Sequence, residues 1–130
     1  MTAEEKIFAV LSVNSPLLAR VPKGRIKVPG DWQSLDLPYI VHFPVAAETI
    51  HCHDGLKALR IWHFYQVSIF AARHSDARAI ADLVVTALDG YHDADVDRIA
   101  LVRPPFSVEY DTDRKVAHVA IDFQVAGALT

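Results

Sequence analysis

The segment His51-Cys52-His53-Asp54 holds the side chains best suited to chemistry, because imidazole and thiolate are good zinc ligands. Two histidines two positions apart in an extended chain point the same way, and His63 becomes a third ligand if neighbouring strands pair. A structural zinc site normally needs four ligands, and the sequence has no second CxxC or HxxxH pair. His51, Cys52 and His53 are therefore weak metal candidates, and a polar loop between strands is favoured. A small metal-dependent or cysteine enzyme built on them stays open as an alternative.

Alternating carboxylates at Asp93, Asp95 and Asp97 resemble the beginning of a calcium-binding loop. Arg98 stands where such a loop needs glycine, and Pro104 stands where it needs a bidentate glutamate. The sequence therefore predicts a solvated acidic loop at this place, without a calcium site of that type.

Motifs for nucleotide binding and for serine hydrolysis do not occur in the sequence. Its five glycines form neither GxGxxG nor the phosphate-binding GxxxxGK[ST] loop, and no serine lies in a GxSxG turn. We expect no cofactor and no enzymatic activity.

Aromatic, aliphatic and basic side chains supply candidates for contacts with other proteins. Trp62 is expected in a core more often than on a surface, whereas Trp32 fits a binding anchor and a lid on its own core equally well. The basic cluster before the first long strand fits a solvated loop better than an electrostatic docking patch. The full set of interface candidates is Trp32, Tyr39, Val41, Trp62, Phe64, Lys23, Arg25 and Lys27.

The first part of the chain is predicted to form a short helix followed by a loop. Residues 3–13 place Ile7, Val10 and Leu11 at helical spacing, which predicts an amphipathic helix. Leu17 and Leu18 add a further turn, and residues 26–28 a short strand, in a stretch otherwise rich in proline and glycine.

Two strands are predicted to follow. Residues 39–45 alternate with period two, and Pro44 places this strand at a sheet edge or next to a bulge, because proline cannot donate a ladder hydrogen bond. Residues 60–70 are rich in aromatic and β-branched side chains on both faces, which indicates a central strand or one whose outer face meets a partner.

A long helix over residues 75–89 is the clearest local pattern. Ser75-Asp76 is expected to cap its beginning and Gly90 to close it. Its apolar face is predicted to consist of Ile80, Leu83, Val84, Ala87 and Leu88.

The last third of the chain is predicted to be β-structure. Short strands over residues 99–102 and 106–110 precede a final strand over residues 117–125, and the last two form a hairpin around the turn at 111–114. The final strand turns alternate side chains inward, namely Ala117, Val119, Ile121, Phe123 and Val125. The fold class is therefore α+β: one domain over residues 1–130, with a small antiparallel (mixed) sheet of about four strands, an N-terminal helix and the long helix packed on one face.

Composition narrows the function classes. With 130 residues, 52% of them hydrophobic, the chain is long enough to bury one core. A net charge of −3 gives no broad cationic face for nucleic acid. Cys52 is the single cysteine and cannot close an intrachain disulfide, which fits a chain that folds in cytoplasm. The N-terminus is not expected to be a signal peptide, and no uncharged stretch reaches membrane-spanning length.

The order of these elements resembles the tail completion, or tail terminator, proteins of long-tailed phages, prophages and gene transfer agents. The resemblance is a diffuse pattern of core and turn residues across almost the whole chain. Its pieces are Ile7-Phe8-Ala9-Val10-Leu11, Ser15-Pro16-Leu17-Leu18, Arg25-Ile26, Leu37-Pro38-Tyr39-Ile40-Val41, residues 64–71, residues 75–90 and Ala120-Ile121-Asp122-Phe123-Gln124-Val125.

This resemblance implies a structural virion protein at the head-proximal end of the tail, assembled in host cytoplasm. Such proteins form a ring, typically of six subunits, that binds the end of the tail tube, stops its polymerisation and presents the surface for the head connector. DNA would pass through the ring without specific binding, and no membrane is involved. A head completion or connector subunit of similar size is the other structural reading.

Overall fold

The computed structural model describes residues 2–29, 36–51, 58–102 and 107–127. In these residues, helices and strands build an α+β fold around a mixed, six-stranded sheet. The strand order is β1 (Ile26–Lys27), β2 (Tyr39–His51), β3 (Ala58–Ala71), β6 (Val116–Gly127) and β4 (Val96–Leu101), and β5 (Glu109–Asp111) pairs with β6. The α+β prediction is confirmed. The expected number of about four strands is too low, because the two shortest strands, β1 and β5, add to the sheet.

The N-terminal helix α1 spans Ala3–Leu11 and begins where the Thr2 hydroxyl accepts a hydrogen bond from the Glu5 N–H at 3.2 Å. The residues predicted to face the core, Ile7, Val10 and Leu11, are buried. The helix ends two residues before the predicted boundary, because the Asn14 side chain caps a new helix. That helix, α2 (Ser15–Leu18), forms the predicted further turn.

A 3-10 turn, η1 (Lys23–Arg25), leads into β1 (Ile26–Lys27). Strand β1 lies parallel to β2 (Tyr39–His51), with Ile26 beside Ile40 and Lys27 beside Val41. This pairing makes the sheet mixed, and it confirms the short strand predicted at this place.

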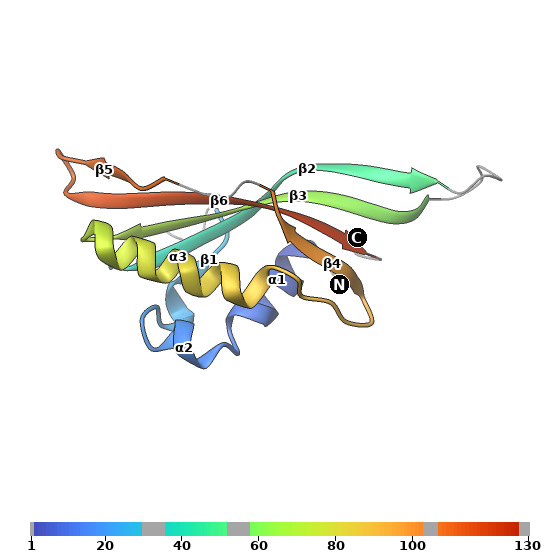
Figure 1. Cartoon of the computed structure of the whole chain (residues 1–130), viewed down its shortest axis with the longest axis horizontal. Coiled ribbons are helices and arrows are strands. Elements are labelled where there is room, and N and C mark those ends of the chain that lie inside the picture. Colours follow the sequence, from blue (N-terminus) through green and yellow to red (C-terminus); the bar gives the residue numbers. More distant parts are fainter. Residues whose placement is uncertain (1, 30–35, 52–57, 103–106, 128–130) are drawn as a thin grey trace.

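Strands β2 and β3 (Ala58–Ala71) form a long antiparallel pair. Both are longer than predicted, and their far ends run past the helices (Figure 1). The register shifts between Pro44 and Ala46, which confirms the bulge expected near Pro44. Beyond Val41, no described strand pairs with the other side of β2, so most of this strand is a sheet edge, as predicted.

Strand β3 occupies the centre of the sheet, between β2 and β6, as predicted. Its side chains at Tyr65, Val67 and Ile69 are buried against the helices. The alternate side chains point to the opposite face of the sheet. The layer of helices therefore covers only one of the two faces of this strand.

Helix α3 spans His74–Leu88, one residue away from the predicted range at each end. The predicted cap at Ser75-Asp76 is wrong: Arg73 is the N-cap and makes no side-chain cap bond, so Asp76 lies inside the first turn, where its charge suits the helix dipole. Gly90 closes the helix at a positive φ of 83°, as its position predicted.

The buried stripe of α3 differs in part from the predicted apolar face. Leu83 and Ala87 are only partly buried, so the stripe is rotated toward residues with smaller side chains. It consists of Ala77, Ile80, Ala81, Val84 and Leu88. Close approach to the sheet explains the two alanines, because short side chains let the helix axis come near the strands.

Strands β4 (Val96–Leu101), β5 (Glu109–Asp111) and β6 (Val116–Gly127) complete the sheet. The predicted hairpin is confirmed, because β5 pairs antiparallel with β6. All of the β6 side chains predicted to point inward are at most 1% exposed, namely Ala117, Val119, Ile121, Phe123 and Val125.

The outer edge of β4 is closed by the segment that follows α3. Gly90 donates to the Ile99 carbonyl at 2.7 Å, Ile99 donates to the Tyr91 carbonyl at 3.0 Å, and Asp93 donates to the Val96 carbonyl at 2.9 Å. These bonds leave few groups on β4 for another strand to pair with. The two long edges of the sheet therefore differ, since β4 is sealed and β2 is open.

The molecule has two layers, with α1, α2 and α3 on one side of the sheet (Figure 1). The hydrophobic core fills the space between these layers and contains side chains from the helices and from five of the strands. None of the helices in the described residues is long and apolar enough to cross a membrane.

Candidate assembly surface

The face of the sheet that points away from the helices carries most of the predicted interface candidates that the structure describes, with Trp62 exposed on it and Val41 buried at 5% exposure. Residues in register across the strands share a face, so the rows Tyr39–Phe70–His118 and Val41–Ser68–Ala120 belong to it. We call this surface the outer face. It consists of Tyr39, Val41, Phe43, Trp62, Phe64, Gln66, Ser68, Phe70, His118, Ala120, Asp122 and Gln124.

Stacked rings cross one end of the outer face. The ring centroids of Tyr39 and Phe70 are 4.7 Å apart, and those of Phe70 and His118 are 4.4 Å apart with an angle of only 2° between the rings. Burial raises the pKa of Tyr39 and lowers the pKa of His118, which keeps both rings uncharged near neutral pH. These three rings, the aromatic ladder, border a pocket of about 330 Å³ with Glu109, Tyr110, Asp111, Arg114 and Val116.

Trp62 and Phe64 lie toward the other end of the outer face. Trp62 is 39% exposed, so the expectation that it belongs to the core is wrong. The reason is topological: Trp62 alternates with the buried His63 and Tyr65 and therefore points away from the helices. Phe64 beside it is half-buried. An indole left this open on a strand is a typical anchor for a protein partner.

The basic residues before β2 are divided between two roles. Lys23 places its Nζ 5.8 Å from the centroid of the Phe8 ring, and Arg25 donates to the Leu37 carbonyl at 3.3 Å. Arg25 also lies 3.9 Å from an Asp36 carboxylate oxygen. Lys27 is different, because its register beside Val41 puts it on the outer face. Of the three, Lys27 is the one that extends the outer face at its β1 edge.

The model of one protein family, described as "Tail completion protein gp17", matches residues 5–126. The match therefore begins within α1, ends within β6 and includes every helix and strand between them. The chain belongs to the tail completion protein family. Its role is a structural one in tail assembly, and it is not an enzyme.

A solved structure agrees with this fold. The chain is similar to a chain in a structure titled "Virion of native gene transfer agent (GTA) particle", with a TM-score of 0.71 and 16% sequence identity. The similarity covers 97% of this chain and 94% of that one. No relative is found among curated protein sequences.

The metal candidates of this tail completion protein receive no support from the described residues. His51 is the last residue of β2, and nothing is described of its side chain, whereas Cys52, His53 and Trp32 lie outside the described residues. His63 is buried on the helix side of the sheet. Among the residues that the structure describes, no three His, Cys, Asp or Glu side chains gather in a way that could hold a metal ion.

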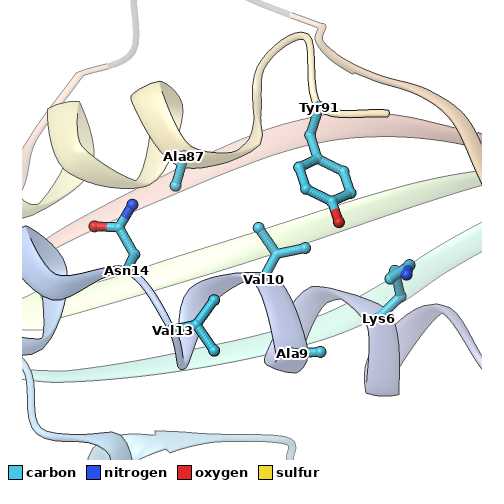
Figure 2. A pocket seen from close by; sticks show the side chains of 7 residues that line it. All are labelled: Lys6, Ala9, Val10, Val13, Asn14, Ala87 and Tyr91. Atoms are coloured by element: carbon cyan, nitrogen blue, oxygen red, sulfur yellow. The ribbon is translucent and has the colours of Figure 1, made fainter. Parts of the chain in front are cut away.

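Figure 2 shows a second pocket, of about 300 Å³, between α1 and the end of α3. Its polar groups already have structural partners. Lys6 pairs with Asp93, the Tyr91 hydroxyl donates to Asp93 at 2.7 Å, and the side-chain Oδ1 of Asn14 accepts from the Leu17 N–H at 3.0 Å. In this tail completion protein the polar groups of the pocket thus have a structural role, because they hold the loop after α3 against α1.

The role of Asp93 corrects the prediction of a solvated acidic loop. Its carboxylate accepts hydrogen bonds from the backbone N–H groups of Asp95 and Val96 in addition to Tyr91 and Lys6. Burial alone would raise the pKa of Asp93, but these bonds hold it well below its usual range, and the bond to Asp93 raises the pKa of Lys6. Sequence reasoning missed this pair because its members are far apart in the chain.

A second buried polar pair was also missed. His42 and the Tyr65 hydroxyl lie 2.6 Å apart under α1, and both residues are 1% exposed. Burial lowers the pKa of His42 to about 4, so the imidazole is neutral at pH 7. The signal in the sequence was the period-two pattern itself, which puts His42 on the same face as the buried Ile40.

Proposed function

We propose that this protein is a tail terminator. In this proposal, copies of the chain, folded as one domain over residues 1–130, form a ring on the head-proximal end of the tail tube. The ring stops tube polymerisation and offers the surface on which the head connector docks. Its place is the head-proximal end of the tail in the virion, after assembly in host cytoplasm, and DNA passes through it without specific binding.

The observation that carries the proposal is the coverage of the sheet on one face only. Trp62, at 39% exposure, is a large side chain on the face of the sheet that the helical layer does not cover. Burying a large apolar side chain contributes about 1.5–3 kcal/mol, so an uncovered row of them favours association. A structural role in tail assembly supplies the partners that such a surface requires.

The sheet edges support a closed ring more than a twofold dimer. A head-to-tail ring uses two different surfaces of each subunit, whereas a twofold dimer uses one surface twice. The open β2 edge and the sealed β4 edge give the two sides of the protein different properties. The β2–β3 ends that run past the helices add a surface that a ring can direct toward the tube or the connector (Figure 1).

Polymerising tail tubes provide the test. Purified protein added during polymerisation is expected to shorten the tubes, and negative-stain images are expected to show a ring at one end of each tube, with sixfold symmetry. Rings of another symmetry would contradict the hexamer. Binding to the isolated head connector, with no binding to tubes, would favour a head completion subunit instead.

A further inference from the structure

Two short edge strands lie on opposite sides of the same end of the sheet. Strand β1 borders β2 at Ile40 and Val41, and β5 borders β6 at residues 116–118. Among the described residues, each of these strands has a strand neighbour on one side only. The row Tyr39–Phe70–His118–Glu109 crosses the sheet between them. Within the described ranges, one copy of the protein therefore has two open edges, which lie at the same level along the strands.

The two edges carry opposite charges on the same face. Lys27 is in register with Val41, Glu109 with His118, and Asp111 with Val116, so all three point to the outer face. The segment 20–27 contains four basic residues and no acidic one. Strand β5 contains two acidic residues and no basic one. Arg114 lies 4.0 Å from Asp111, which leaves Glu109 as the carboxylate without an ion pair among the described residues.

The pocket at the β5 edge suits an ammonium group. Glu109 lies at its border and supplies a carboxylate, and the three rings of the aromatic ladder line it with apolar surface on which the stem of a lysine can pack. His118, with its pKa lowered by burial, is neutral at pH 7 and does not repel a cation there. Lys27, which makes no ion pair among the described residues, has the complementary chemistry and lies on the matching face of the opposite edge.

We propose that the β1 edge of one copy packs against the β5 edge of the next, with Lys27 entering the pocket beside Glu109 and the aromatic ladder. This inference rests on the proposed function, because it names the contact that joins subunits of the ring. The contact uses each edge once per copy, which is the condition for a closed head-to-tail assembly. Strand β4 is not available for it, since residues 89–93 already seal that edge.

Cysteine cross-linking in the full chain tests this contact. In a Cys52→Ser background, Lys27→Cys protein is mixed with Glu109→Cys protein on tail tubes and oxidised. Disulfide-linked dimers that contain one copy of each variant are expected, and the doubly substituted chain is expected to give a ladder of oligomers that ends at the ring. As the matched control, Lys27→Cys is mixed with Arg98→Cys, on the sealed β4 edge, and is expected to stay uncross-linked.

Charge reversal gives an independent measure. Lys27→Glu or Glu109→Lys alone puts like charges together at every junction, and the protein concentration needed for rings on tubes should rise about tenfold. The two reversals in one chain should restore ring formation. Glu5→Lys, the same charge change on exposed α1, should leave it unaltered.

The outcomes separate this contact from the function. If unaltered protein forms rings on tubes while the Lys27 and Glu109 cysteines do not cross-link and the reversals have no effect, the contact is wrong and the terminator role stands. A cross-link from Lys27→Cys to the tube protein would also contradict the proposed contact between subunits. If unaltered protein does not bind tube ends at all, the proposed function itself fails.

Discussion

His42 and Tyr65 form a polar pair inside an otherwise apolar core, and the pair sets a pH dependence of stability. The pKa of His42 is lowered from 6.5 to about 4 by burial. Between these values the unfolded chain binds the proton and the folded chain does not. Stability from this group is therefore fully present above about pH 6.5 and decreases as the pH falls toward 4.

A His42→Gln variant tests this sign. Urea unfolding of the unaltered protein should show a free energy of unfolding that falls by up to about 1.4 kcal/mol per pH unit between pH 6.5 and 4 because of this residue. The variant should be less stable at pH 7.5, with a shallower decrease. Some decrease remains, because burial also lowers the pKa of His118. Equal slopes for the two proteins would contradict a neutral, buried His42.

The pair between Lys6 and Asp93 fastens α1 to the loop after α3, and the side chain of Lys6 is only 11% exposed. Lys6→Met should lower the free energy of unfolding by about 2 kcal/mol, since a hydrogen bond between charged groups is lost and a partly buried carboxylate loses its partner. Thermal and urea unfolding would measure the loss. Arg20→Met, at an exposed arginine, is the matched control, and an equal loss in both would refute the role of Lys6.

These two pairs mark the limit of what the sequence could predict for single residues. The strand pattern put His42 on the same face as Ile40 but did not show which face is buried. Neither its hydroxyl partner nor the partner of Lys6 could be read from the sequence, because Tyr65 and Asp93 come near only when β3 and the loop after α3 are in place. Asp93 was predicted to be solvated for this reason.

At the scale of elements, α3 shows how periodicity finds a helix but not its rotation. Leu83 and Leu88 both fit the predicted apolar face, yet Leu88 is fully buried and Leu83 only partly. Ala77 and Ala81, which look neutral in a sequence, are buried. The rotation of the helix follows from the fit against the strands, which no local pattern contains.

The two leucines of α3 give a direct comparison. Leu88→Ala should cost about 2–5 kcal/mol of stability, because it leaves a cavity in the core. Leu83→Ala should cost clearly less, since part of its side chain already contacts solvent. Urea unfolding of both variants decides between the observed and the predicted buried stripe, and a larger loss at Leu83 would favour the predicted one.

The pairing of β4 with β6 depends on Gly127, because a residue with a side chain would not fit there. A Cβ at this position would lie 3.0 Å from the Cα of Val96 and nearer still to the Asp95 carbonyl oxygen, both of which are backbone atoms. Gly127→Ala should therefore push the beginning of β4 away from β6. Faster hydrogen exchange over residues 96–101 would show it. Gly24→Ala, where nothing lies within 4 Å, is the control and should leave exchange unchanged.

At the scale of the whole molecule, the two-layer arrangement could be predicted, because one long amphipathic helix and a clean inward alternation in the last strand require it. The number and order of strands could not. The two-residue β1 and three-residue β5 are too short to give a periodic signal. They form because the long strands β2 and β6 offer backbone groups to pair with. The edge properties that the assembly proposals use arise from these short strands.

Because the helices cover only one face of the sheet, the fold predicts which layer meets the tail tube. Trp62→Ser with Phe64→Ser removes apolar surface from the outer face and should weaken binding to tube ends at least about tenfold, with little change in melting temperature, because Trp62 is already 39% exposed. Val13→Ser removes an even more exposed apolar side chain, 77% accessible, from the helical layer and should leave binding intact. Sedimentation with tubes measures both. If Val13→Ser were the damaging change, the helical layer would be the binding face, and the uncovered sheet would need a different partner.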